Sequence, residues 1–518
     1  MTNPTLKPPN EGLPRHLLHE FTEKLRWQMG LHFDSSRTDD LERRLRAAST
    51  EFGFAAVEAC LHWLVTTPFD DRMVEILSTH FTVGETYFFR HPEQFEILEG
   101  SLLPALKVER SQRRKRIRIW SAGCCTGEEA YSIAIACRRA LPDIENWHIT
   151  VLATDVNTRY LRKAAKGVFT EWSFREAPPL LKANYFTSCG EGLYALREEI
   201  RHAVTFQYLN LAEDPFPSFF NNTYAMDIIF CRNVLMYFSP SQAQRVLDRL
   251  YHSLADGGYL VMGPSDLHGL RASRFGHCPR IGNAIYRKEP AIPAVYSATP
   301  PPAAGPLQNT APIDSPSTAR APDSHSSGLS LRTDEAPGHT GEKAVSRYDA
   351  AVHAYEEGRY DAVIASLGKL LEDHRESRPA HETDVAKFIL LARACANQGD
   401  LESAREWCEK AIEADRTQSA HHYLHATILD EQNEWNEAQE ALRKALYLDP
   451  SFVIAHVALA NLYRRRGILQ SANRSYGNAL ALLQRMDHET VLPESDGITA
   501  GRMAELIMTM LAQETLLS

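Results

Sequence analysis

The sequence predicts an α/β protein in which a sheet covered by helices on both faces lies between two all-helical regions. Three observations predict this arrangement. Short apolar runs alternate with longer amphipathic stretches between residues 101 and 289, as in parallel sheets with crossover helices. Before them, apolar residues recur at helical spacing, and after them small residues recur every 34 positions.

The first helical region spans residues 13–100. Its apolar residues follow the spacing of one helix face, in two series: Leu17, Phe21 and Leu25, then Leu41, Leu45 and Ala48. Such spacing is typical of amphipathic helices that bury one side. We therefore expect a small all-α domain ahead of the sheet.

The central region, residues 101–289, carries five predicted strands and at least two clear helices. The strands are 117–120, 148–154, 204–209, 227–231 and 259–262, and the helices are 128–140 and 239–254. This alternation predicts a parallel sheet, and ligands of such sheets bind at the carboxyl ends of the strands. The basic run at residues 108–118 is expected to be a solvated approach to the first strand.

Residues 290–344 are rich in Pro, Ala and Ser and predict a disordered linker, so that the region beyond it is expected to be flexibly tethered. Beyond it, residues 345–486 contain a 34-residue repeat, the period of tetratricopeptide repeats. Its equivalent positions are Ala392, Ala426 and Ala460; Ala404, Ala438 and Ala472; Ala411, Ala445 and Ala479; and the turn residues Gly399, Asn433 and Gly467. Because several sets of positions share the 34-residue spacing, a repeat array is favoured over a simple bundle. Residues 487–518 are expected to form a helical tail.

Composition excludes several classes of protein. The formal net charge of −10 argues against non-specific nucleic-acid binding, and no apolar stretch is long enough to insert into a membrane. The nine cysteines include no C-x-x-C pair, and the amino terminus does not resemble a signal peptide. We therefore expect a cytoplasmic protein in a reducing compartment, without a metal site.

The segment SAGCCTGEEAYS, residues 121–132, lies where the first strand gives way to a helix. It lacks the Gly-Lys-Ser/Thr of a Walker loop and the third glycine of a dinucleotide fingerprint. Glu128 and Glu129 would repel a phosphate but suit the cationic sulfonium and ammonium of S-adenosylmethionine. Asp155, after the second strand, could then accept from the ribose hydroxyls. The alternatives stay open: Asp155 as a helix N-cap, and the two glutamates as partners of the helix dipole.

Six stretches together resemble the chemotaxis receptor methyltransferases, the CheR family, over residues 13–288. They are LERRLR at 41–46, TYFFRHPEQF at 86–95, SAGCCTGEEAYSIAIA at 121–136, ATD at 153–155, LNL at 209–211 and FCRNVLMYF at 230–238. The resemblance implies a Rossmann-like domain that uses S-adenosylmethionine to methylate glutamates of a chemoreceptor. An ionised glutamate needs no general base, only desolvation and alignment with the methyl carbon.

Carried over by position, the resemblance assigns a cofactor site and two catalytic residues. The cofactor residues are Thr86, Arg90, Gly123, Glu129, Asp155, Asn210, Leu211, Arg232 and Asn233; the catalytic residues are Arg90 and Tyr237. Arg43, Arg44 and Arg46, on one predicted helix, are assigned to docking of glutamate-rich receptor helices. Gly84 stands where the family often has Asn, and Cys125, where it often has Ser, is read as a small loop filler.

The sequence therefore predicts a cytoplasmic protein-glutamate methyltransferase of signal transduction that acts on a chemoreceptor or a receptor-like protein. The tetratricopeptide repeats are expected to bind a signalling protein. The alternative from another class is an inactive scaffold in which only the repeats function, and the intact Arg90, Glu129, Asp155, Asn233 and Tyr237 disfavour it.

Overall fold

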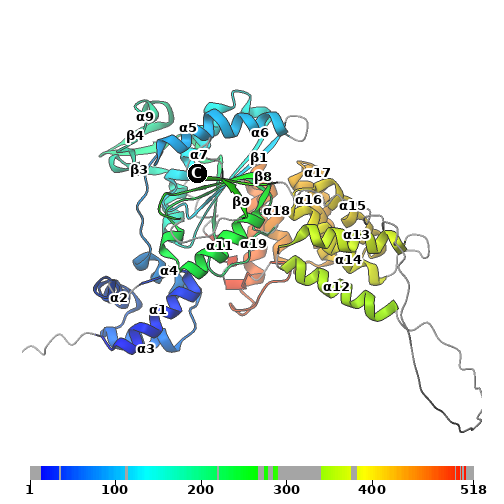
Figure 1. Cartoon of the computed structure of the whole chain (residues 1–518), viewed down its shortest axis with the longest axis horizontal. Coiled ribbons are helices and arrows are strands. Elements are labelled where there is room, and N and C mark those ends of the chain that lie inside the picture. Colours follow the sequence, from blue (N-terminus) through cyan, green and yellow to red (C-terminus); the bar gives the residue numbers. More distant parts are fainter. Residues whose placement is uncertain are drawn as a thin grey trace, which may run out of the picture.

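The computed structural model of the chain has an α/β centre flanked by two sets of helices (Figure 1). It describes residues 13–33, 37–110, 115–218, 221–266, 274–277, 284–289, 340–356, 358–374, 382–495, 498–501, 503–504, 507–508 and 511. The predicted linker, residues 290–344, falls outside the described residues up to position 339.

The amino-terminal region, as far as the structure describes it, contains the helices α1 (Arg15–Met29), α2 (Thr38–Phe52), α3 (Val57–Thr66) and α4 (Asp71–Phe81). The predicted apolar faces are buried, since Phe21, Leu25 and Leu45 lie wholly inside one apolar cluster. Three further helical segments lead to the sheet: α5 (Pro92–Ile97), a π-helical turn (Leu98–Leu102) and α6 (Leu103–Arg110). The predicted helical region is therefore present.

The central sheet, within the described residues, has seven strands in the order β6-β2-β1-β7-β8-β10-β9. The five predicted strands are its parallel part: β1 (Arg116–Ala122), β2 (His148–Asp155), β6 (Val204–Tyr208), β7 (Met226–Cys231) and β8 (Leu254–Met262). In the register of β1 against β2, Arg116 lies opposite His148 at one end and Ala122 lies opposite Thr154 at the other. The predicted parallel sheet is confirmed for these five strands, and β10 (Ile285–Lys288) and β9 (Phe275–His277) add an antiparallel edge that the sequence did not indicate.

Alternation along β1 sends its side chains to two faces of the sheet. Ile117 and Ile119 join the apolar cluster that includes residues of α7 (Glu128–Ala140), whereas Trp120 joins the cluster that includes α11 (Pro240–Ser253). Helices therefore cover both faces, and the loop that follows β1 is held between two packed layers.

The remaining short elements connect these strands. They are α8 (Thr158–Lys166), α9 (Leu181–Tyr185), α10 (Glu198–Arg201) and the 3₁₀ turns Ile144–Asn146, Glu171–Phe174 and Leu235–Tyr237. A small antiparallel sheet, in the order β3-β5-β4, is inserted between β2 and β6. Its strands are β3 (Val168–Thr170), β4 (Phe186–Gly190) and β5 (Leu193–Leu196).

Consecutive helix pairs form the carboxyl-terminal array, four of them among the residues that the structure describes. The pairs are α12 (Thr340–Glu356) with α13 (Tyr360–His374), α14 (Glu382–Asn397) with α15 (Leu401–Ala414), α16 (Ser419–Glu431) with α17 (Trp435–Leu448), and α18 (Val453–Arg465) with α19 (Leu469–Leu483). The turn residues Gly399, Asn433 and Gly467 have φ of 81°, 63° and 72°, the left-handed backbone that their residue types favour. The 34-residue period therefore marks the pairs correctly.

The array packs against the amino ends of the sheet strands, at the right of the sheet in Figure 1. Its intra-pair turns make the contact. A Cβ placed on Gly399 would lie 3.1 Å from the Cβ of Ala225, next to β7, and one on Gly358 would lie 3.1 Å from the His252 ring. The expectation of a flexibly tethered module is therefore wrong, because the repeats dock directly on the α/β domain.

Glu431, at the end of α16, supplies the negative charge of this contact. Its Oε2 accepts hydrogen bonds from Arg118 Nη1 at 2.8 Å and Arg116 Nη1 at 3.0 Å. Arg118 is wholly buried, its guanidinium lying 4.2 Å from the centre of the Tyr224 ring. The solvated position expected for the end of the 108–118 run is thus wrong, because these two arginines face an acidic partner 313 and 315 residues away.

The predicted helical tail begins instead with a loop. Val491 and Thr499 form an isolated antiparallel bridge, and Leu492 donates from its N–H to the carbonyl of Ile498 at 2.9 Å. Helical backbone starts only at Ala500. Pro493, which has no N–H, and Glu494, at φ 61°, are both incompatible with a continuous helix.

Candidate active site

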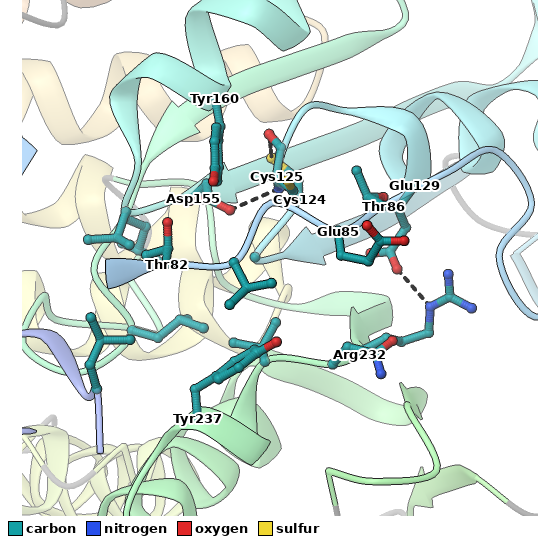
Figure 2. A pocket seen from close by; sticks show the side chains of 18 of the residues that line it. Thr82, Glu85, Thr86, Cys124, Cys125, Glu129, Asp155, Tyr160, Arg232 and Tyr237 are labelled. Carbon is teal, nitrogen blue, oxygen red and sulfur yellow. Dashed lines mark hydrogen bonds and ion pairs between the residues drawn. The ribbon is translucent and has the colours of Figure 1, made fainter. Parts of the chain in front are cut away.

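A pocket opens at the carboxyl ends of β1, β2 and β7, the position that the parallel sheet predicts. Its volume is about 930 Å³, open solvent at its mouth included. The assigned cofactor and catalytic residues all line it: Thr86, Arg90, Gly123, Glu129, Asp155, Asn210, Leu211, Arg232, Asn233 and Tyr237. Figure 2 shows Asp155 and Tyr160 on one side, Glu129 and Arg232 on the other, and Tyr237 directed toward the centre.

Asp155, the last residue of β2, is held by backbone donors. Its Oδ2 accepts from the N–H of Cys125 and its Oδ1 from the N–H of Asn157, both at 2.8 Å. The N-cap of α8 is Asn157, whose side chain accepts from Arg159 and Tyr160, so Asp155 is not the helix cap. Burial raises the pKa of Asp155 to about 6, against the opposing effect of its N–H donors. The carboxylate thus faces the pocket without a cationic partner among the described residues.

The loop after β1 approaches its neighbours closely. Gly123 has φ of 80°, and a Cβ placed on it would lie 2.4 Å from Val234 Cγ2, so only glycine fits there. Cys124 and Cys125 are buried beside it, and burial raises the pKa of both thiols. Neutral thiols are poor nucleophiles, which agrees with a filling role for Cys125.

The two glutamates that begin α7 have different partners. Glu128 accepts from Thr126 Oγ1 at 2.6 Å and from Ser173 Oγ at 2.9 Å, so it joins the loop to the Glu171–Phe174 turn. Glu129 accepts from Ser121 Oγ and from Arg232 Nε, both at 2.7 Å.

Arg232 is almost wholly buried and serves several partners at once. Besides Glu129, it donates through Nη1 to the carbonyl of Arg90 at 2.6 Å and to Gln94 Oε1 at 2.7 Å. Its guanidinium also lies 5.2 Å from the centre of the Phe95 ring. Arg232 therefore ties the segment after α4 to β7, and its charge is largely compensated within the protein.

Asp266 organises the turn that carries Asn233 and Tyr237. Its carboxylate accepts from the N–H groups of Asn233, Val234 at 2.9 Å and Met236 at 3.2 Å. Asn233 itself has φ of 58°, and no donor among the described residues reaches its buried Oδ1. The turn thus offers the pocket one acceptor that still needs a partner.

Tyr237 and Arg90 reach the pocket from segments far apart in the sequence. Burial raises the pKa of the Tyr237 hydroxyl, and the positive charge of Arg90 opposes that shift. Arg90 donates to the carbonyl of Glu85 at 2.8 Å, which leaves other guanidinium N–H groups for a ligand. Both side chains are half-buried.

Asn210 lines the pocket, but its side chain bonds mainly to other segments of the protein. Its Nδ2 donates to the carbonyl of Gln28 at 2.6 Å, and its Oδ1 accepts from Ala212 N–H at 3.1 Å. It therefore joins α1 to the segment after β6, while Leu211 and Thr86 add an apolar and a hydroxyl contact to the lining.

Sequence reasoning missed Tyr160, which lines the pocket from the first turn of α8. A Cβ placed on Gly84 would lie 2.6 Å from its hydroxyl oxygen. The ring thus takes the space that a side chain at position 84 would need. Gly84 was the signal that could have found it, because a missing side chain in a lining segment leaves room for another residue. Met29 and Leu31, at the end of α1, also line the pocket and carried no local signal.

The three arginines assigned to docking lie on α2, outside the pocket lining. Arg43 and Arg44 both bond Asp40, and Arg46 pairs with Glu42 at 3.5 Å. Arg44 also donates to the carbonyl of His80 at 2.9 Å, and its side chain is only 19% exposed against 77% for Arg43. Arg43 and Arg46 therefore face solvent, whereas Arg44 fastens α2 to α4.

The fold and this site define an α/β enzyme domain, with a pocket of both acidic and basic residues at the carboxyl edge of its sheet, fused to helical repeats. Residues 84–279 match the family model described as CheR methyltransferase, SAM binding domain, and residues 354–428 and 423–487 match tetratricopeptide repeat models. The chain belongs to the CheR methyltransferase family and carries carboxyl-terminal tetratricopeptide repeats.

Curated relatives match either the central domain or most of the chain. "Chemotaxis protein methyltransferase 2" of Vibrio cholerae serotype O1 is 37% identical over 36% of this chain, and the match spans 62% of that relative's length. "Probable chemotaxis protein methyltransferase" of Rhizobium etli is 31% identical over 39% of this chain and 75% of its own. "Probable biofilm formation methyltransferase WspC" of Pseudomonas aeruginosa is 28% identical over 88% of this chain and 96% of its own.

Among solved structures, "MamA 41-end from Desulfovibrio magneticus RS-1" covers 29% of this chain at 19% identity with a TM-score of 0.26. A score that low carries no argument about function. Within the described part of the chain, no helix combines the length and apolar character needed to cross a bilayer.

Proposed function

We propose that this chain transfers a methyl group from S-adenosylmethionine to glutamate side chains of a chemoreceptor or a receptor-like signalling protein. One observation carries the proposal. Residues from segments far apart in the sequence, from Thr86 to Tyr237, meet in a single pocket at the carboxyl edge of the sheet. The short motifs that assign these residues carry no information on how they lie relative to one another.

The chemistry of the lining suits a cationic nucleoside. Asp155 offers a buried carboxylate that could accept from two ribose hydroxyls, and the unpartnered Oδ1 of Asn233 could accept from an ammonium. The negative charge of Asp155 has no cationic partner among the described residues, and a bound sulfonium would supply one. S-adenosylmethionine, when bound, supplies the electrophilic methyl group.

Arg90 and Tyr237 are suited to the substrate carboxylate. A glutamate with a pKa of about 4.3 is ionised at neutral pH, so no proton has to be removed. The two side chains would orient one carboxylate oxygen toward the methyl carbon and exclude water from it. The products would be a glutamyl methyl ester and the demethylated cofactor, with no change in the protonation of either residue.

Exposed Arg43 and Arg46 would favour the approach of a glutamate-rich helix through opposite charge. Replacing both by Glu should lower the rate of receptor methylation at limiting receptor, without changing cofactor affinity. Arg44→Ala is the contrasting variant, because the loss of its contacts with α4 should lower the melting temperature instead. Equal methylation by the double variant and the wild type would remove α2 from the docking surface.

The direct test of the function is transfer of labelled methyl from S-adenosylmethionine to receptor membranes. Label that is released by mild alkali identifies an ester, and Asp155→Asn serves as the matched variant with a damaged cofactor site. An inactive scaffold, the second candidate, would bind receptor but release no alkali-labile label. That result, obtained with protein that binds the cofactor, would overturn the enzymatic assignment.

A further inference from the structure

The inner wall of the repeat array is formed by the first helix of each pair. α12 contacts α14, and α16 contacts α18, so these helices touch their equivalents in neighbouring pairs. In a curved array, the layer whose helices touch in this way is the compressed, concave side. The concave face therefore consists of α12, α14, α16 and α18, and it differs from the edge of turns that docks on the α/β domain.

A loop from the carboxyl-terminal end of the chain reaches this concave face. We call it the C-terminal loop, residues 490–500, of which 496 and 497 lie outside the described residues. Its base is closed by two backbone bonds, from Ala500 N–H to the Thr490 carbonyl at 2.8 Å and from Leu492 N–H to the Ile498 carbonyl at 2.9 Å. Ser495 is buried and donates through Oγ to the Leu492 carbonyl at 2.6 Å. The described residues of the loop are thus held together by bonds within the loop.

Glu494, at the tip of the loop, directs its carboxylate toward α14. Glu494 forms an ion pair with Arg393 on α14, 101 residues earlier in the chain and two pairs away from α19, which precedes the loop. Glu494 holds this position with φ of 61°, a backbone conformation that costs a non-glycine residue free energy. The ion pair, together with the loop's backbone bonds, therefore holds a strained residue across the concave face.

Two positions before Glu494, Leu492 supplies the apolar contact. It is buried and belongs to the same apolar cluster as Tyr423 on α16 and Ile454 and Val457 on α18. Tyr423 and Val457 are equivalent positions, 34 residues apart, on successive first helices. The loop therefore adds one apolar side chain to the cluster of the last two pairs and one acidic side chain to α14.

We propose that the concave face of the repeats binds a peptide turn in which a branched apolar residue is followed two positions later by a carboxylate. The C-terminal loop occupies this face as an internal ligand. A partner that carries the same pattern must displace the loop, so the repeats of the resting chain are closed to it. The inference is independent of the methyl-transfer activity, because it involves no residue of the active-site pocket.

The test uses the whole chain and four variants. Glu494→Lys places a cation opposite Arg393 and should release the loop. Arg393→Glu should also release it, but this variant loses the cation that receives an external carboxylate. Combining the two substitutions restores an ion pair of reversed polarity and should return the loop to its position in the wild type. Glu489→Lys, the same charge change at an exposed position just before the loop, is the control.

Two readouts distinguish the outcomes. Hydrogen exchange of residues 490–500 should be faster in both single variants than in the wild type, the control and the double variant. A fluorescent synthetic peptide with the sequence of residues 487–500 should bind Glu494→Lys at least about tenfold more tightly than the wild type, because the tethered competitor is gone. Arg393→Glu should bind it no better than the wild type does.

Two results would overturn the proposal. One is loop exchange that is the same in Glu494→Lys and in the control, because the ion pair would then not hold the loop. The other is peptide binding that is equal in Glu494→Lys and Arg393→Glu, or absent from both, because Arg393 would then not bind the carboxylate of the peptide. Circular dichroism of each variant checks the fold, and recovery of protection in the double variant excludes general unfolding as the cause.

Discussion

Glu431→Gln tests the contact that joins the repeats to the α/β domain. The substitution keeps the size and shape of the side chain but removes the charge that faces Arg116 and Arg118. Burial alone would raise the pKa of Glu431, yet the attraction of these arginines lowers it from 4.5 to about 2. Since one pKa unit corresponds to about 1.4 kcal/mol, the ionised carboxylate stabilises the docked state by about 3 kcal/mol.

That magnitude agrees with the cost of about 3 to 5 kcal/mol for breaking a buried ion pair. It corresponds to a change of about a hundredfold in the ratio of docked to undocked molecules. Because the folded pKa is depressed, this stabilisation is present above about pH 4.5 and is lost as the pH falls toward 2. The contribution of Glu431 to docking should therefore be insensitive to pH near neutrality.

The assay is small-angle scattering combined with hydrogen exchange at the Glu431–Asn433 turn. We expect Glu431→Gln to increase the radius of gyration and to speed exchange at that turn. Glu440→Gln is the control, because Glu440 pairs with Arg443 at 3.2 Å on the surface, where such a pair contributes at most about 1 kcal/mol. If the two variants behave alike, the buried pair does not hold the array in place.

Three further predictions concern the pocket. The dissociation constant for S-adenosylmethionine should rise as the pH falls below about 6, because protonated Asp155 is a weaker acceptor; calorimetry on Asp155→Asn should show no such dependence. Tyr237→Phe should keep cofactor affinity but slow single-turnover methylation at least about tenfold, and an unchanged rate would remove its hydroxyl from the reaction. Gly84→Ala should weaken cofactor binding several-fold by displacing Tyr160, and it should add little to Tyr160→Ala in a double-mutant cycle; additive losses would contradict that contact.

The parallel strands and the repeat pairs could be predicted because each has a local signal. Residues 116–119, at the predicted strand 117–120, alternate in polarity, and Gly123 follows the strand; β1 covers it with one added residue before and two after. The repeats can be recognised from their 34-residue period alone. By contrast, β9 and β10 have three and four residues, too few for a periodicity, and their pairing depends on the neighbouring β8.

The pocket lining was accessible from motifs, whereas the docking contact was not. Arg116 and Arg118 look like the polar positions of a half-exposed strand, but both pair with Glu431, and the buried Arg118 also donates to the carbonyls of Tyr224 and Asn222. A charge pair between residues more than 300 positions apart leaves no mark on the local pattern of either segment. Tyr160 was missed for a related reason, because its role follows from an absent side chain at Gly84 rather than from a motif.

The docked edge of turns has a mechanical consequence. Repeat arrays deform like springs, because small rotations between successive pairs add up along the solenoid. Here the turns at Gly358, Gly399 and Glu431 are all fixed to the same globular domain, so the first three pairs cannot change their pitch independently. A pull on a ligand in the concave face would thus not be absorbed by stretching of these pairs. It would be transmitted through Glu431 to the amino end of β1, the strand whose other end leads into the loop around Gly123.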